Sequence, residues 1–314
     1  MIMIDFDLPS GSKDAPVVLG LGVFDGVHRG HRKIISELVA MGRRCGAVPV
    51  AVTFMPHPRN VLCPPPLPRL LMPPEERFRR LREAGARGIG IIEFTRELAD
   101  TPPAEFVSRL LEQHPPIHGV CVGSRWRFGR GGAGDTEFLA RELAKRNVAF
   151  SAVPELQMND IIVSSSAIRE AVAVGNIAGA SEMLGAPPCL YGEVEQGFGI
   201  AARTLHVPTA NIRVDFGILP PDGVYAGRTT LDGKRFAAVV NIGFSPTFGG
   251  TAERRVECHV IGFSGDLYRK RIAVELAAKL REERKFDSAD DLAGQIRRDL
   301  EQAAGFSSLN EAKR

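Results

Sequence analysis

Two histidines, His28 and His31, lie in a glycine-rich segment at 22–31 with the sequence GVFDGVHRGH. An apolar run at 17–21 precedes the segment and predicts a buried strand, and a helical pattern of apolar residues follows it at 34–39. The start of a helix carries unpaired backbone N–H groups and partial positive charge, so it binds phosphate readily. Glycines let the backbone approach a ligand closely, and histidines add donors that become cationic beside an anion. The pattern predicts a site that holds and cleaves a nucleotide polyphosphate.

A metal site and a purely structural turn are the competing interpretations of these histidines. The spacing of His28 and His31 differs from the helical zinc pair His-Glu-x-x-His, and no Glu or Cys lies nearby to complete a ligand set. In the structural alternative, the segment is a tight strand-to-helix turn and the histidines have no chemical role. The candidate cofactor-binding residues of the segment are Gly22, Phe24, Asp25, Gly26 and Gly30.

The longer string Gly-x-Phe-Asp-Gly-x-His-x-Gly-His resembles the adenylyltransferase half of the prokaryotic bifunctional riboflavin kinase/FAD synthetases. The resemblance implies that the FMN phosphate attacks the α-phosphorus of ATP and expels pyrophosphate, with Mg²⁺ bridging the phosphates. It assigns His28 and His31 to the ATP phosphates and Arg169 to the developing negative charge. Positioning and charge stabilisation are then the main tasks of the protein.

A second string, TFMPHP at 53–58, follows a strand predicted at 48–54. Its prolines restrict the backbone, and its apolar flanks suit a wall against a flat ring system. A rigid loop without a ligand is the alternative. The string resembles Thr-Phe-x-Pro-His-Pro of the FAD synthetases, where this loop lines the FMN pocket. Pro56, His57 and Pro58 are therefore candidate cofactor-binding residues.

The stretch at 122–129 resembles the family's Val-Gly-x-Asp/Asn-Phe-x-Phe-Gly, and Gly123 and Arg125 are its candidate cofactor-binding residues. The chain departs from the family here, because Arg125 stands in place of the carboxylate or amide and Trp126 in place of Phe. A guanidinium cannot accept a hydrogen bond, although it could pair with a phosphate or a flavin oxygen. The departure leaves open an enzyme whose adenylylation is impaired.

A third string, VSSSAIR at 163–169, resembles Ile-Ser-Ser-Thr-x-Ile-Arg near the end of the same domain. Hydroxyl groups at a helix start cap the helix and can bind phosphate. A plain capping run is the alternative. Because the string follows the two earlier ones in family order, we interpret Ser164, Ser165, Ser166 and Arg169 as phosphate-binding.

The string VPTAN at 207–211 resembles the Pro-Thr-Ala-Asn loop of the riboflavin kinases. A hydroxyl and an amide two residues apart suit an ATP-bound Mg²⁺, so Thr209 and Asn211 are the candidate metal ligands. Arg203 and Asn211 are candidate cofactor-binding residues of this half. Further kinase strings follow in family order, among them Val-Glu-Cys-His-Val at 256–260.

Glu257 lies in a strand predicted at 255–261, where alternate side chains face opposite sides. If it faces the ligand, the resemblance makes it the general base that takes the proton of the ribityl 5′-hydroxyl. A strand carboxylate in solvent is the alternative. The kinase half departs from the family at Ala202 and His206, which replace two glycines before the Pro-Thr-Ala-Asn loop. Alanine disfavours positive φ and adds bulk near phosphate, so this half is expected to be weak or to bind its nucleotide differently.

Short apolar runs alternate with amphipathic segments over 17–150, which predicts an open parallel sheet with helices on both faces. Ligands of such sheets lie beyond the carboxyl ends of the strands. After the prolines at 187–188, successive strands predict a small antiparallel barrel that ends in a helix from about Ser288. The expected fold class is α/β plus β. It combines a Rossmann-like nucleotidyltransferase domain at 1–186 with a flavokinase β-barrel and terminal helix at 187–314.

For two of the expected helices, the sequence also predicts which side chains are exposed and which are buried. The arginines of the helix predicted at 74–84 are interpreted as a solvated face, because a short run of charge is usually exposed. They are Arg77, Arg79, Arg80 and Arg82. The terminal helix is expected to be capped at Ser288 and to bury one apolar stripe. The stripe consists of Leu292, Ile296 and Leu300.

The composition is that of a globular protein large enough for two domains: 314 residues, 44% hydrophobic and 25% charged. The net charge of +3 and the lack of long basic blocks argue against a nucleic-acid partner. Five scattered cysteines without a CxxC spacing indicate neither a disulfide framework nor a zinc site. With no apolar stretch near 18 residues and no leader pattern, no membrane partner is expected, and the expected compartment is the cytoplasm. The oligomeric state does not follow from the sequence.

The sequence favours a flavin-cofactor enzyme that phosphorylates riboflavin with ATP to FMN and adenylylates FMN to FAD. Three alternatives stay open. One half alone is active, with adenylylation impaired by Arg125. The chain is a flavin-binding regulator without turnover, against which Glu257 argues because binding alone requires no base. The chain adenylylates another substrate, against which the ordered kinase strings argue.

Overall fold

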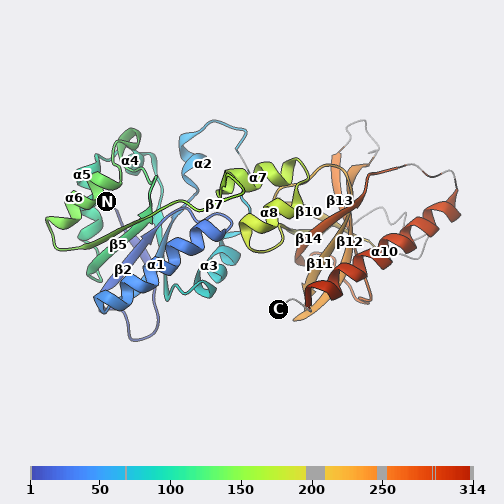
Figure 1. Ribbon diagram of the computed structural model, residues 1–314, viewed down its shortest axis with the longest axis horizontal. Coiled ribbons are helices and arrows are strands. Elements are labelled where there is room, and N and C mark those ends of the chain that lie inside the picture. Colours follow the sequence, from blue (N-terminus) through green and yellow to red (C-terminus); the bar gives the residue numbers. More distant parts are fainter. Residues whose placement is uncertain are drawn as a thin grey trace. The chain divides into compact units, whose positions relative to one another are not determined.

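The computed structural model describes residues 2–67, 69–195, 209–245, 253–284, 286 and 288–311 (Figure 1). The chain divides into two compact units. The first comprises Met1–Pro68 and Pro74–Ser164, and the second comprises Arg69–Pro73 and Ser165–Arg314.

The first unit alternates strands and helices. In chain order its elements are β1 (Ile4–Asp7), β2 (Val17–Leu21), α1 (Arg29–Cys45), β3 (Val48–Met55), α2 (Pro58–Leu62), α3 (Pro74–Glu83), β4 (Gly88–Glu93), α4 (Arg96–Ala99), α5 (Pro103–Leu111), β5 (Ile117–Gly123), the 3₁₀ turn η1 (Arg130–Gly132), α6 (Thr136–Ala144), β6 (Ala149–Val153), β7 (Gln157–Met158) and β8 (Ile161–Ile162).

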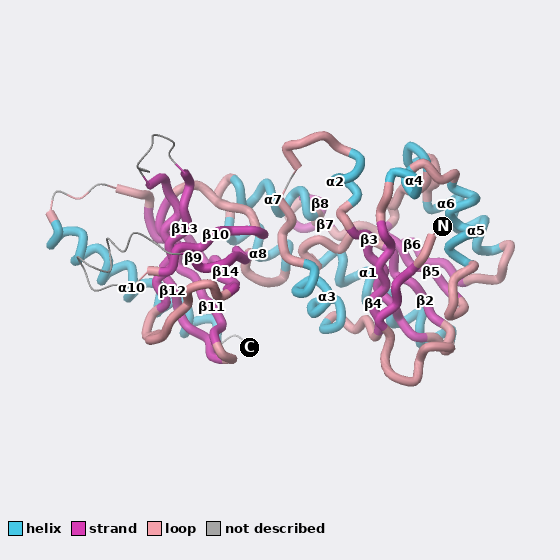
Figure 2. The backbone as a smooth tube through the Cα atoms, turned by 180° about the vertical axis from the view of Figure 1, so that it is seen from behind, coloured by secondary structure: helices cyan, strands magenta, loops and turns pink. Residues whose placement is uncertain are grey.

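Six of these strands form one sheet, and Figure 2 draws strands in magenta. The strand order is β1-β4-β3-β2-β5-β6, with β1 antiparallel to β4 and the other neighbours parallel. The parallel sheet expected from the sequence is confirmed. One face of β2 meets α1, since a Cβ on Gly20 would lie 2.9 Å from a methyl of Leu38. The other face shares its core with α5 and α6 through Val17, Leu19 and Leu21. Helices therefore cover both faces, and β2 is buried throughout.

The second unit begins with two helices and continues as a barrel. Its elements are α7 (Ser165–Ala173), α8 (Ile177–Leu184), β9 (Cys189–Glu195), β10 (Ala210–Phe216), β11 (Gly223–Leu231), β12 (Lys234–Ser245), β13 (Glu253–Val260), β14 (Arg271–Arg281) and α10 (Ala289–Glu311).

The six strands close in the order β10-β13-β12-β11-β14-β9, and neighbouring strands run antiparallel. The antiparallel barrel and its terminal helix are thus confirmed. The sequence prediction omits β10, although its apolar residues Ile212, Val214 and Phe216 alternate with polar ones as a half-buried strand requires. Within the described residues, none of the helices is both long and apolar enough to cross a membrane.

Helix α3 is not the solvated face that its arginines predict. Arg77 is 3% exposed and Arg80 is 8% exposed, whereas Arg79 and Arg82 are exposed. Arg77 lies one helical turn before the fully buried Leu81, so the two share the inward face of the helix. The prediction of a solvated face is therefore wrong for two of the four arginines. A guanidinium can be buried where hydrogen-bond acceptors surround it.

Helix α10 begins as expected but buries different residues. The Ser288 hydroxyl accepts the backbone N–H of Asp291 at 3.1 Å, which confirms the predicted cap. The expected stripe is only half-buried, and the most buried residues described on this helix are Asp299 at 3% and Ala303 at 0% exposed. The stripe residues concerned are Leu292, Ile296 and Leu300.

The burial of Asp299 has an electrostatic cause. Arg281, at the end of β14, donates to Asp299 through Nη2 at 2.9 Å and through Nε at 3.0 Å. Gln295 donates to the same carboxylate at 2.7 Å. A two-pronged guanidinium–carboxylate pair of this kind is geometrically specific, so it fixes how α10 meets the barrel.

The variant Asp299→Asn is expected to lower the free energy of unfolding of the second unit by about 3 kcal/mol, because Arg281 would keep a largely buried charge without its carboxylate. Denaturant titration followed by circular dichroism measures the change. Glu301→Gln, on the exposed side of α10, is the matched control. The only tryptophan, Trp126, lies in the first unit, so its fluorescence transition should stay in place. An unmoved circular dichroism transition would contradict the role of the pair.

Candidate active sites

The segment at 22–31 connects β2 to α1 in an unusual backbone conformation. His28 is the N-cap of α1, and its Nδ1 accepts the backbone N–H of His31 at 3.3 Å. Phe24 and Val27 have positive φ angles of 55° and 42°, a region that bulky side chains rarely adopt. Such a conformation persists only where its surroundings hold it, and it is typical of functional turns.

The two histidines form one stacked unit at this helix start. Their ring centroids are 3.6 Å apart with an interplanar angle of 19°, and the Phe24 ring meets His31 edge-on at 5.3 Å. Burial lowers the pKa of His31 well below its usual value, and the nearby His28 and Arg77 lower it further. His31 Nδ1 is buried and has no hydrogen-bond partner among the described residues. An arriving polyanion would reverse this balance, since negative charge favours the protonated ring.

Glycine is required where other parts of the chain press against the segment. A Cβ on Gly22 would lie 3.0 Å from the Phe24 ring. A Cβ on Gly30 would lie 3.1 Å from the His28 ring and 3.4 Å from the Val163 carbonyl oxygen. Gly30 therefore lets the chain just before Ser164 approach the start of α1. Gly26, with φ of 89°, supplies the left-handed turn between the two halves of the segment. Asp25, the last of the candidate residues here, is 1% exposed.

The loop after β3 reaches the same edge of the sheet, because β2 and β3 are parallel neighbours. Thr53 donates through Oγ1 to the Val23 carbonyl at 3.0 Å and so joins the two segments. His57 caps α2 by accepting the backbone N–H of Arg59 at 3.1 Å, Pro58 begins that helix, and Pro56 is exposed. The structure thus places all three predicted loop residues near the carboxyl end of β3.

Gly123 ends β5, the other neighbour of β2, so it also lies at this edge. Arg125 forms an ion pair with Glu155, and the side chain of Arg125 is 69% exposed. A pocket of about 630 Å³ opens beside it. Its lining residues are Ser124, Arg125, Trp126, Arg127, Asp135, Thr136 and Glu137. The departure from the family pattern is thus accommodated by a local carboxylate partner.

The serine string spans the division between the units. Ser164 is the last residue of the first unit, and Ser165 begins α7 in the second unit, which also contains Ser166 and Arg169. Arg169 donates through Nε to the carbonyl of Arg69 at 2.9 Å. Arg169 and the stacked histidines therefore belong to different compact units.

In the barrel, the register of the strands sets three polar side chains in one row. Glu257 of β13 lies directly opposite Asn211 of β10 on one side and Asn241 of β12 on the other. Directly opposed residues of antiparallel strands share a face, so the three side chains project together. Thr209 immediately precedes β10, two residues before Asn211. Hydroxyl, amide and carboxylate oxygens are ligands that suit Mg²⁺. Among the described residues, no cluster of three or more His, Cys, Asp or Glu forms a metal site by itself.

A further carboxylate stands next to this row. Asn241 donates through Nδ2 to Glu283 at 3.4 Å. The Glu283 carboxylate lies over Gly243, where a Cβ would come within 2.0 Å of Oε1. Burial raises the pKa of Glu257, Arg255 opposes that rise, and Glu283 adds to it. A carboxylate whose pKa is raised is better matched to accepting a proton near neutral pH.

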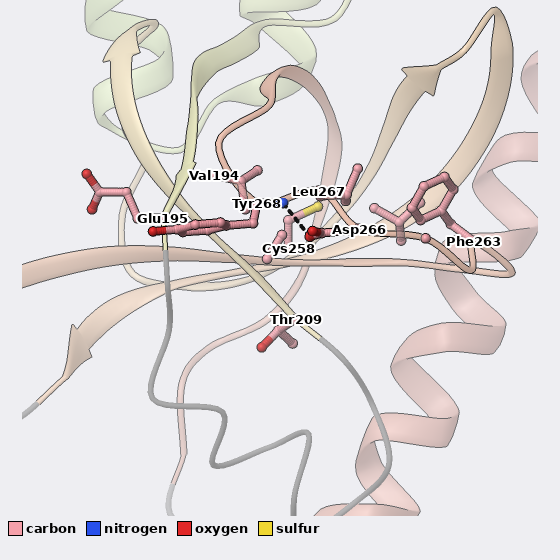
Figure 3. A pocket seen from close by; sticks show the side chains of 11 residues that line it. Val194, Glu195, Thr209, Cys258, Phe263, Asp266, Leu267 and Tyr268 are labelled. Carbon is pink, nitrogen blue, oxygen red and sulfur yellow. Dashed lines mark hydrogen bonds between the residues drawn. The ribbon is translucent and has the colours of Figure 1, made fainter.

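A pocket of about 380 Å³ opens at one end of the barrel strands (Figure 3). Apolar side chains such as Val194, Leu267 and Tyr268 line it, and Thr209 lies at its margin. Asp266 accepts the backbone N–H of Tyr268 at 2.8 Å, which holds that loop in shape (Figure 3). The strand β13 contributes Cys258, whose thiol has a pKa raised to about 12 by burial. Cys258 is adjacent to Glu257 in sequence, so the pocket and the polar row lie on opposite faces of β13.

Three predicted kinase positions, Ala202, Arg203 and His206, lie outside the described residues. Sequence reasoning also missed one buried charge beside the first site. Arg77 of α3 donates through Nη1 to the Val23 carbonyl at 3.0 Å. Its spacing of four residues from the buried Leu81 was the available signal, since a charge on the apolar face of a helix needs a specific partner.

Comparison with known proteins covers both units. A family model for FAD synthetase matches residues 11–167, and one for riboflavin kinase matches residues 184–306. The bifunctional riboflavin kinase/FMN adenylyltransferase of Escherichia coli K12 is 34% identical over 94% of each chain. The proteins of the same name from Pseudomonas fluorescens and Bacillus subtilis are 32% and 30% identical, over 93% and 94% of each chain.

A crystal structure described as a macrolide-efflux protein from Streptococcus pneumoniae has the same fold. It superposes with a TM-score of 0.83 at 28% identity and covers 95% of this chain and 96% of its own. The two family models together cover most of the chain, and the relatives are at least 30% identical over more than nine tenths of each chain. The chain belongs to the family of bifunctional riboflavin kinase/FMN adenylyltransferases.

Proposed function

We propose that this protein phosphorylates riboflavin with ATP to give FMN and adenylylates FMN with a second ATP to give FAD and pyrophosphate. The observation that carries the proposal is the presence, in one chain, of both a stacked histidine pair at a helix start and a carboxylate flanked by two amides. We assign adenylylation to residues 1–186 and phosphorylation to residues 187–314. The two family models support this division, since one ends at 167 and the other begins at 184.

In adenylylation, a phosphate oxygen of FMN forms a bond to the α-phosphorus of ATP while the bond to pyrophosphate breaks. His28 and His31 hold the ATP phosphates at the start of α1, where the unpaired backbone N–H groups also point. The N–H groups of their rings donate hydrogen bonds to the phosphates, which stabilises the charge that grows on the leaving group. Ser164, the last residue of the same unit, is also proposed to bind phosphate. Ser165, Ser166 and Arg169 are proposed phosphate-binding residues at the start of the second unit.

The flavin is proposed to lie against the loop at 53–58 and the edge near Gly123, at the carboxyl end of the sheet. Arg125 is compatible with this reaction, because its guanidinium already pairs with the carboxylate of Glu155. An ion pair so exposed contributes little free energy, so a ligand phosphate can compete for Arg125 at small cost. An adenylylation defect at Arg125 is therefore not expected.

In phosphorylation, Glu257 takes the proton of the ribityl 5′-hydroxyl as its oxygen bonds to the γ-phosphorus of ATP and ADP leaves. Thr209 and Asn211 would hold Mg²⁺, and the ion, when bound, would supply charge neutralisation for ATP. The pocket beside Thr209 takes the adenosine end of ATP, and the neutral Cys258 thiol serves as an apolar wall.

Incubation of the purified protein with riboflavin, ATP and Mg²⁺ is expected to yield both FMN and FAD, separated by chromatography. Removing divalent cations with a chelator should stop both steps, because both reactions act on ATP phosphates. Formation of FMN without FAD would indicate that adenylylation is impaired at Arg125. Flavin binding without any product would replace the proposal by a regulator without turnover.

His28→Ala is expected to lower FAD formation from FMN at least 100-fold, because it removes a phosphate donor and the cap of α1 together. FMN formation from riboflavin should stay within about twofold, since the kinase residues lie in the other unit. The exposed His118, changed to Ala, is the control. Wild-type FAD synthesis in the His28 variant would refute the assignment.

Glu257→Gln is expected to show the reverse pattern. It keeps the shape of the side chain but removes the proton acceptor, so FMN formation should fall about 100- to 10,000-fold. FAD formation from added FMN should be unaffected. Glu282→Gln, a change at an exposed side chain of the same unit, controls for loss of charge. Retention of kinase activity in the Glu257 variant would show that another group takes the proton.

A further inference from the structure

Arg77 is a charged side chain almost fully enclosed in the first unit. It projects from the inward face of α3, is 3% exposed, and lies 54 residues from Val23, whose carbonyl accepts its Nη1–H at 3.0 Å. Burying a guanidinium is costly unless it is hydrogen-bonded and placed near negative charge. Apolar packing alone therefore does not explain why an arginine occupies this buried position.

The carbonyl that Arg77 contacts belongs to the turn that leads into α1. Val23 lies in the segment at 22–31, immediately before the positive-φ residue Phe24 and five residues before the N-cap His28. The same carbonyl accepts the hydroxyl of Thr53, a residue of β3 that is fully buried. Two donors, one from a helix and one from a strand, therefore converge on one oxygen of the phosphate-binding turn.

The charge of Arg77 also reaches the reacting groups. Asp25, buried in the same turn, attracts the guanidinium, and Arg77 in turn acts on His31. Arg77 Nε is buried and has no hydrogen-bond partner among the described residues, so one donor of this cation is unpaired there. A fixed positive charge behind the histidine pair adds to the potential that attracts a polyphosphate.

We propose that Arg77 is a positioning residue for adenylyl transfer: together with Thr53 it fixes the Val23 carbonyl and thereby holds the strained turn that presents His28 and His31. The inference rests on the proposed adenylyltransferase function. A turn with bulky residues at positive φ relaxes when its restraints are removed. The stacked rings would then lose their alignment with the ATP phosphates, and small misplacements of positioned groups cost large factors in rate.

The test compares steady-state FAD synthesis from FMN in the full-length wild type and in Arg77→Met, which fills similar volume without charge or donors. Arg77→Met is expected to lower kcat about 10- to 100-fold and to change KM for FMN by less than threefold, because alignment rather than flavin binding is lost. Arg77→Lys restores a cation and a donor and should recover part of the rate. Arg79→Met, on the exposed side of α3, is the control and should match the wild type.

A double-mutant cycle with Thr53→Val separates positioning from general stability. Both side chains act through one carbonyl, so the double variant should be no more than about threefold slower than Arg77→Met alone. Independent structural roles would instead multiply the two losses. Riboflavin phosphorylation by the same preparations, expected within twofold of wild type, reports whether the chain is folded.

The outcomes are distinguishable from those of the proposed function. If the wild type makes no FAD, the proposed function fails before the variants matter. If the wild type makes FAD and Arg77→Met matches its kcat, the inference is overturned. Multiplicative losses in the cycle, or no recovery in Arg77→Lys, would likewise overturn it. Should Arg77→Met not fold, Thr53→Val and Arg77→Lys alone must still show the kcat loss without a matching KM change.

Discussion

The first unit depends on the hydrogen bonds that converge on the Val23 carbonyl. Phe24 and Val27 adopt backbone angles that their side chains disfavour, and a turn of that kind persists only under restraint. Thr53 and Arg77 supply the restraint from two different elements. The parallel order of the sheet brings their elements to the edge where β2 ends, so the turn, the loop after β3 and the end of β5 meet there. The turn before α1 is thus tied by side-chain hydrogen bonds to both β3 and α3.

In the second unit, strand register rather than a restrained turn positions the polar side chains. Closing six antiparallel strands into a barrel fixes their register, and the register sets Asn211, Glu257 and Asn241 opposite one another. The period of two along β13 then separates Glu257 from the Cys258 pocket. The polar row and the pocket thus occupy different faces of the same strand, each set by the register. The carboxylate of Glu283, packed over Gly243, shows how little room this row leaves for other side chains.

Much of the architecture was predictable because local signals agreed with the fold. The strands predicted at 17–21 and 48–54 are β2 and β3, and the helix predicted at 74–84 is α3. For α3 and α10, the predictions of exposed and buried residues failed because charged groups are buried there. Arg77, Arg80 and Asp299 are charged, and sequence patterns place charges on the surface. Their acceptors and donors, such as Val23 and Arg281, come from distant parts of the chain.

The sequence by itself determined the chemical groups on offer: histidines at a helix start, a Thr-Ala-Asn string, a strand glutamate and their order along the chain. Those features depend on residue type and short spacing, which a sequence displays directly. Only the tertiary structure decided which groups share a face, which ion pairs are buried, and that Arg77 supports the turn rather than meeting solvent. Those properties arise from strand register and long-range packing, in which a residue's neighbours are 30 to 54 positions away. Arg125 is an example of both. The sequence shows that its residue type departs from the family pattern, and only the folded structure shows that it pairs with Glu155.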